Sequence, residues 1–161
     1  MREFDNDGLI LCELQAAIFE KSIENNSSSM VFAKRFMNSN IAIRMDNLGF
    51  LNESTSVSDS LNEVSEQYEN KDYGSKKINS ESLYWCGYIY RYWAYVFEVP
   101  SKEIYQIINV EELSNHYMAY HTLDPKQAIE RIYEEKSIEL PRDEIPFDYV
   151  LNVLKRIRKN G

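Results

Sequence analysis

Glycine and proline are scarce in this chain, with five glycines and four prolines among 161 residues. Because β proteins built from many short strands need frequent turn residues, this scarcity favours helices. Hydrophobic residues make up 43% of the chain and aromatic residues 13%, which excludes a disordered chain. The length suits one domain, so we expect a single all-α domain over residues 1–161.

Only two cysteines are present, Cys12 and Cys86, and neither has the neighbouring Cys or His of a zinc site. Each lies in an apolar helical pattern, which predicts two buried free thiols in a reducing compartment. The chain has no apolar stretch of 18 residues, and its first apolar run, residues 9–12, is broken by Glu13. These features predict a soluble cytoplasmic protein with no signal peptide and no membrane association.

Motifs of catalysis and cofactor binding are missing as well. The sequence has no phosphate-binding glycine loop and no dinucleotide fingerprint. His116 and His121 stand five positions apart, which on a helix points them about 140° away from each other, so they do not form a metal pair. We therefore predict no catalytic residue, no metal site and no cofactor, and we interpret the chain as a non-enzyme.

The net charge is −8, and it is unevenly distributed. Residues 98–148 contain twelve acidic against five basic side chains, whereas residues 155–161 contain four bases and no acid. An acidic body argues against direct binding of nucleic acid, which requires a basic face. It suits a basic protein partner, because opposite charges speed encounter. The same acidity would serve solubility alone, and the sequence leaves both interpretations open.

Apolar residues at helical spacing predict about six to eight helices. A polar segment near residues 69–78 is the best candidate for a mobile loop. The last helix, after Pro146, is amphipathic and is expected to turn five apolar side chains inward: Tyr149, Val150, Val153, Leu154 and Ile157. The other helices are expected over about residues 7–24 (with Asp7 as its cap), 29–37, 57–68, 81–98, 101–108, 110–120 and 124–135.

The helix at residues 81–98 contains seven Tyr and Trp residues and one Phe around a single arginine, Arg91. Its apolar arc is so wide that we place this helix at the centre of the fold. A narrow strip remains, formed by Gly87, Arg91, Ala94 and Glu98 and bordered by three tyrosines. Arg91 could pair there with Glu98 or another internal acid, or it could bind an anion or a partner. The predicted binding residues are Tyr84, Tyr88, Arg91, Tyr95 and Glu98.

The aromatic string Leu83-Tyr-Trp-Cys-Gly-Tyr-Ile-Tyr-Arg-Tyr-Trp93 is followed by Ser101-Lys-Glu-Ile-Tyr105. Together with Phe36-Met-Asn-Ser39 and His121-Thr-Leu-Asp-Pro125, it resembles a group of small bacterial antitoxin-like proteins from toxin–antitoxin-type operons. Some of those proteins are encoded beside toxins similar to ADP-ribosyltransferases. The resemblance leaves out residues 49–78 and the tail. It implies an antitoxin or accessory role and assigns no catalytic residue.

The leading hypothesis is an interaction protein that binds and neutralises a co-encoded toxin enzyme. A second hypothesis is a small anion-binding domain or enzyme that uses Arg91 and the neighbouring tyrosines. A third is an acidic mimic of nucleic acid that blocks a nucleic-acid-binding protein. A homo-oligomer is also compatible with the sequence, since an exposed aromatic surface serves a self-interface equally well.

Overall fold

Ten α-helices and no strand are found in the computed structural model, which describes residues 1–53, 55–141 and 147–160. The all-α class is therefore confirmed. Two 3-10 helices lie at Ser22–Glu24 and Gly49–Asn52. The α-helices are α1 (Asn6–Lys21), α2 (Ser29–Met37), α3 (Asn40–Asp46), α4 (Val57–Gln67), α5 (Ser80–Phe97), α6 (Ser101–Ile107), α7 (Val110–Asn115), α8 (Tyr117–Tyr120), α9 (Pro125–Glu135) and α10 (Phe147–Asn160).

Side-chain caps explain where several helices begin. Asn79 accepts a hydrogen bond from the Ser82 amide at 2.9 Å and so starts α5. Asp124 caps α9 directly before Pro125, which stands in the first turn where its missing N–H costs nothing. The cap of α1 is Asp5 rather than the expected Asp7, because the Asp5 carboxylate accepts from the Gly8 amide at 3.0 Å.

Two helix boundaries are absent from the expected ranges. Ser39 accepts from the Ala42 amide at 3.2 Å and starts α3 as a separate helix. His116 separates α7 from α8, within the stretch expected to form one helix. These interruptions account for a larger number of helices than the predicted six to eight, since apolar spacing continues across each of them.

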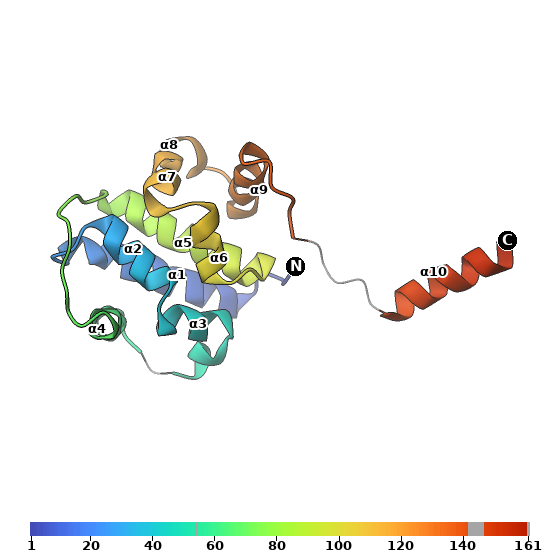
Figure 1. Cartoon of the computed structure of the whole chain (residues 1–161), viewed down its shortest axis with the longest axis horizontal. Coiled ribbons are helices and arrows are strands. Elements are labelled where there is room, and N and C mark those ends of the chain that lie inside the picture. The colour runs from blue at the N-terminus through green and yellow to red at the C-terminus, as the bar shows by residue number, and fades with distance from the viewer. Residues whose placement is uncertain (54, 142–146, 161) are drawn as a thin grey trace.

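The aromatic helix α5 is central, with α1 running antiparallel beside it, α7 to α9 on one side and α3 and α4 on the other (Figure 1). A Cβ added to Gly87 would lie 2.8 Å from the carbonyl oxygen of Gln15, so glycine permits the close approach of α1. The Trp93 ring is fully buried, and its Nε1 donates to the Tyr133 hydroxyl at 2.8 Å. These contacts place α1 against the Gly87 side of α5 and α9 against the Trp93 side.

Both cysteines are buried and free, as predicted. Burial raises the pKa of the Cys12 thiol to about 12 and that of Cys86 further, so neither is a reactive thiolate. Among the helices of the described ranges, none combines the length and the hydropathy that a membrane crossing requires.

The polar segment near residues 69–78 runs along the beginning of α2. The Ser28 amide donates to the Tyr73 carbonyl at 2.8 Å, and the Ser29 amide donates to the Lys76 carbonyl at 3.0 Å. The Ile78 amide in turn donates to the Ser29 hydroxyl at 2.9 Å. Backbone bonds therefore hold this segment at several points, and its mobility remains a prediction.

The last helix, α10, does not bury the residues expected to face inward. Leu154 and Ile157 are 51% and 62% exposed, and in Figure 1 the helix lies apart from the others. The prediction that these two side chains join the core is wrong. Tyr149 and Val150 lie outside the side chains that the structure describes. Membership of α10 in one domain with α1 to α9 remains a prediction.

Candidate functional site

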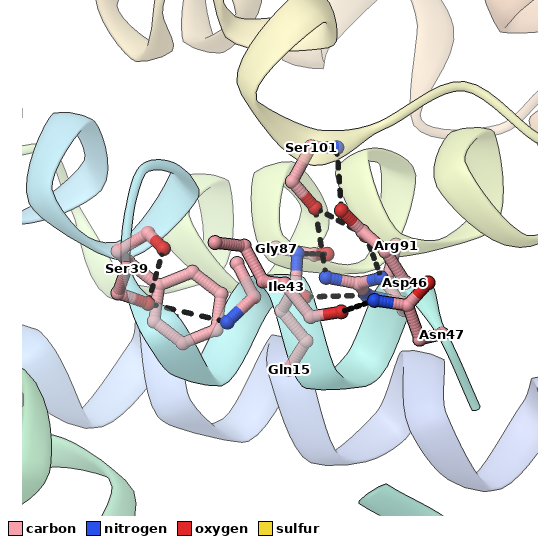
Figure 2. Close-up of polar contacts among 10 residues, drawn as sticks. Gln15, Ser39, Ile43, Asp46, Asn47, Gly87, Arg91 and Ser101 are labelled. Atoms are coloured by element: carbon pink, nitrogen blue, oxygen red, sulfur yellow. Dashed lines mark hydrogen bonds and ion pairs between the residues drawn. The ribbon is translucent and has the colours of Figure 1, made fainter. Parts of the chain in front are cut away.

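Arg91, the centre of the predicted site, is buried, with 1% of its surface exposed. Its guanidinium makes three hydrogen bonds, each to a different helix segment (Figure 2). Nε donates to the Gln15 side-chain oxygen at 2.7 Å, Nη1 to Asp46 Oδ1 at 2.6 Å, and Nη2 to the Ser101 hydroxyl at 3.0 Å. The charge on Arg91 is therefore matched by a carboxylate inside the protein.

The partners of Arg91 make further hydrogen bonds within the protein. Asp46 ends α3 and accepts from Ser101 twice, from the amide at 2.9 Å and from the hydroxyl at 2.7 Å. Gln15 donates its amide to the Gly87 carbonyl at 3.1 Å. No buried side-chain nitrogen or oxygen of the described residues lacks a hydrogen-bond partner. This polar network joins α1, α3, α5 and α6, and its hydrogen bonds are made within the protein.

The structure thus contains the internal pairing that the sequence left as one of two alternatives. The acid that pairs with Arg91 is Asp46 rather than Glu98. A helical wheel places Arg91 on a narrow strip but does not reveal that α1, α3 and α6 cover this strip. Arg91 is consequently not available to a partner or an anion in this conformation.

Tyr95 and Glu98 hold the N-terminal segment against the end of α5. Tyr95 is buried, and its hydroxyl donates to Asp5 Oδ1 at 2.5 Å. Burial, and then the Asp5 carboxylate, raises the pKa of Tyr95 to about 12. Glu98 is exposed and pairs with Arg2 at 3.2 Å, and the Arg2 guanidinium lies 4.7 Å from the centroid of the Tyr95 ring. Both predicted site residues are thus engaged with the N-terminus.

Tyr84 and Tyr88 are the predicted site residues that face outward on the body of α5. Tyr84 is 37% exposed and Tyr88 is half-buried. Burial, and then the carboxylates of Glu13 and Glu20, raises the pKa of the Tyr84 hydroxyl. Burial, with the Glu13 carboxylate adding to it, raises the pKa of Tyr88 to about 12. We name Tyr84, Tyr88, Glu13 and Glu20 the Tyr84–Tyr88 surface.

This surface suits a cationic side chain. The faces of tyrosine rings attract Lys and Arg, and neighbouring carboxylates add charge complementarity. Both acids are exposed and belong to α1, about seventy positions from the tyrosines in the sequence. Sequence reasoning missed them because the antiparallel pairing of α1 with α5 brings them together. The seven-residue spacing of Glu13 and Glu20 along one helix face was the only signal present.

The two histidines have structural contacts. The His116 Nδ1 lies 2.9 Å from the Glu112 carbonyl oxygen, and its Nε2 lies 2.8 Å from Glu135 Oε2. His121 stacks on Tyr117 with ring centroids 4.4 Å apart. With both ring nitrogens of His116 facing acceptors, this residue is not free to act as a base. The residues that the structure describes contain no cluster of His, Cys, Asp and Glu that could hold a metal ion.

No protein-family model, no curated protein and no solved structure matches this chain. Of the predicted site residues, Tyr84 and Tyr88 are the two that reach the surface without being engaged by the N-terminal segment.

Proposed function

We propose that this protein is a non-enzymatic interaction protein that binds and neutralises a toxin enzyme encoded beside it. The observation that carries the proposal is the Tyr84–Tyr88 surface, where phenol rings and carboxylates lie together on the exposed edge between α1 and α5. Tyrosine is enriched among residues that dominate binding energy in protein interfaces. The identity of the partner as a toxin comes from the resemblance of the aromatic string to antitoxin-like proteins.

The chemistry of this surface indicates a partner with an exposed Arg or Lys at the centre of its contact. A net charge of −8 would steer such a partner toward the protein before contact. At the contact, a guanidinium would lie on the Tyr84 ring and pair with Glu20 or Glu13. The buried Arg91 network supports the proposal indirectly, because it keeps the underlying helices in one arrangement.

The test is co-expression of the protein with the product of the neighbouring gene, followed by co-purification and a growth assay. We expect a stable complex and rescue of growth. Tyr84→Ala should weaken the complex about tenfold or more, which corresponds to about 1.4 kcal/mol. Tyr73→Ala is the control, because Tyr73 is also exposed, at 57%, but lies in the segment beside α2. If no complex co-purified and growth were not rescued, the proposal would be wrong.

The alternative of an anion-binding domain centred on Arg91 receives no support from the geometry, since Asp46 already neutralises this guanidinium. No observation on the described surface favours a mimic of nucleic acid over a partner-binding role.

A further inference from the structure

The C-terminal helix α10 has an apolar side that no other described element covers. Leu151, Leu154 and Ile157 are 37%, 51% and 62% exposed, although they follow one another at helical spacing. A helix of this length is marginal in water unless its apolar side packs against something. An exposed stripe of large aliphatic side chains therefore indicates a docking element.

The same helix has a basic side. Lys155, Arg156, Arg158 and Lys159 are all exposed. Among the described side chains, none of these four bases takes part in an ion pair. A surface that covers α10 should accordingly combine apolar side chains with carboxylates.

A groove of about 820 Å³ between α6 and the end of α9 offers both features. Its lining is Glu103, Gln106, Ile107, Lys136 and Ile138. Ile138 is 42% exposed, whereas Ile107 is half-buried. The Lys136 charge is already paired with Glu112 at 2.8 Å, which leaves Glu103 as the charge that the groove presents.

A helix-ending turn fixes the apolar wall of this groove. Ser137 has a φ of 54°, and the Ile138 amide donates back to the Tyr133 carbonyl at 3.0 Å. This is the hydrogen-bond pattern of a Schellman motif, which sets the direction of the chain after a helix. Ile138 is therefore held at the groove by backbone geometry and needs no ligand to be in place.

We infer that α10 of one copy of this protein docks into the α6–α9 groove of a second copy, and that the exchange is reciprocal. The apolar stripe of α10 would cover Ile107 and Ile138, and its bases would approach Glu103. Within one copy the apolar stripe of α10 and the α6–α9 groove are both exposed. A second copy bound reciprocally would cover both surfaces in each copy. A two-fold arrangement repeats the contact and doubles the buried area.

Pairing of two α10 helices with each other is a less suitable way to cover the exposed side chains of α10 and of the groove. It would bring the four bases of each helix toward those of its partner, and like charges oppose such contact. It would also leave the groove uncovered.

The experiment is sedimentation equilibrium of the full chain at micromolar concentrations. We expect a mass near twice 19.0 kDa. Ile157→Asp on α10 and Ile138→Asp in the groove should each give a monomer. Asn152→Asp and Thr122→Asp introduce the same charge at exposed polar positions and should remain dimeric. Circular dichroism checks that each variant is folded. We expect folding to be retained, because the substituted side chains are exposed.

Mixing the two monomeric variants makes the test specific. The Ile157→Asp chain keeps an intact groove and the Ile138→Asp chain keeps an intact α10, so a mixed dimer retains one of two contacts. We expect this mixture to dimerise more strongly than either variant alone. A wild-type monomer, or a groove variant that remains dimeric while the α10 variant does not, would overturn the inference. Neither result affects binding at the Tyr84–Tyr88 surface, so the two proposals fail separately.

Discussion

Arg91 and Tyr84 lie less than two turns apart on α5, yet they belong to different regions of the molecule. Around Arg91, four helices meet, and a carboxylate, an amide and a hydroxyl accept its hydrogen bonds. Tyr84, by contrast, is 37% exposed, and two carboxylates of α1 act on its hydroxyl. On this helix the charged residue belongs to the core, whereas the tyrosine Tyr84 lies at the exposed edge.

This difference follows from the cost of burial. Burying a guanidinium without a partner costs a large desolvation free energy. An arginine on a central helix is therefore paired with a carboxylate. A tyrosine is less demanding, since its ring packs while its hydroxyl reaches water. The inner region therefore determines stability and the outer region is free to determine binding.

Removing Arg91 should have the largest effect on the inner region. Arg91→Met leaves Asp46 half-buried without its counter-ion, and we expect the free energy of unfolding to fall by about 3–5 kcal/mol. Urea denaturation measures this. Lys102→Met, at an exposed position of α6, is the control and should change stability by about 0.5 kcal/mol or less. If the two variants were equally stable, Arg91 would have no structural role.

Gly87 tests how closely α1 approaches α5. A Cβ at this position would lie 2.8 Å from the Gln15 carbonyl oxygen and 2.9 Å from Phe19. We expect Gly87→Ala to destabilise the protein by about 1–3 kcal/mol, although alanine favours helices by about 1 kcal/mol. Gly49→Ala is the control, because nothing lies within 4 Å of its Cβ. A more stable Gly87→Ala variant would mean that α1 and α5 are further apart.

The bond between Tyr95 and Asp5 should appear in the pH dependence of stability. The Tyr95 hydroxyl, and then the Gly8 amide, lower the pKa of Asp5 from 3.8. The unfolded chain therefore binds more protons in acid, and this contribution is present above pH 3.8 and lost as the pH falls through the folded-state pKa. Tyr95→Phe should flatten this acid dependence in denaturation curves taken at several pH values. Tyr73→Phe should retain the wild-type slope.

Tyr84 should have the smallest effect on stability. Because its ring is partly exposed, we expect Tyr84→Ala to lower the free energy of unfolding by about 1 kcal/mol or less. Thermal denaturation beside wild type provides the measurement. A loss as large as that of Arg91→Met would place Tyr84 in the core and remove it from the candidate surface.

Much of the fold could be predicted from the sequence. Caps such as Asn79 and Asp124 have local signals, and the wide apolar arc identified α5 as central. The covering of the Arg91 strip could not be predicted, because Gln15, Asp46 and Ser101 reach it from distant parts of the chain. Helical periodicity also failed to separate α9 from α10. Both are amphipathic, yet Ile129 and Ile132 are buried while Leu154 and Ile157 are exposed.

The candidate site was predicted only in part for the same reason. Its tyrosines stand in one string, and their spacing shows which of them share an edge of the helix. Glu13 and Glu20 join them through tertiary packing of α1, which no local pattern encodes. Periodicity shows that a face is apolar but not what covers it.

The most direct test of the central claim is the dissociation constant of the proposed complex with a co-encoded toxin, measured for two folded variants. Arg91→Lys keeps the buried charge and alters only the inner region, whereas Tyr84→Ala alters only the outer one. We predict that Arg91→Lys retains the wild-type affinity and that Tyr84→Ala loses about tenfold or more. The reverse result, with affinity lost on Arg91→Lys and unchanged on Tyr84→Ala, would contradict the account.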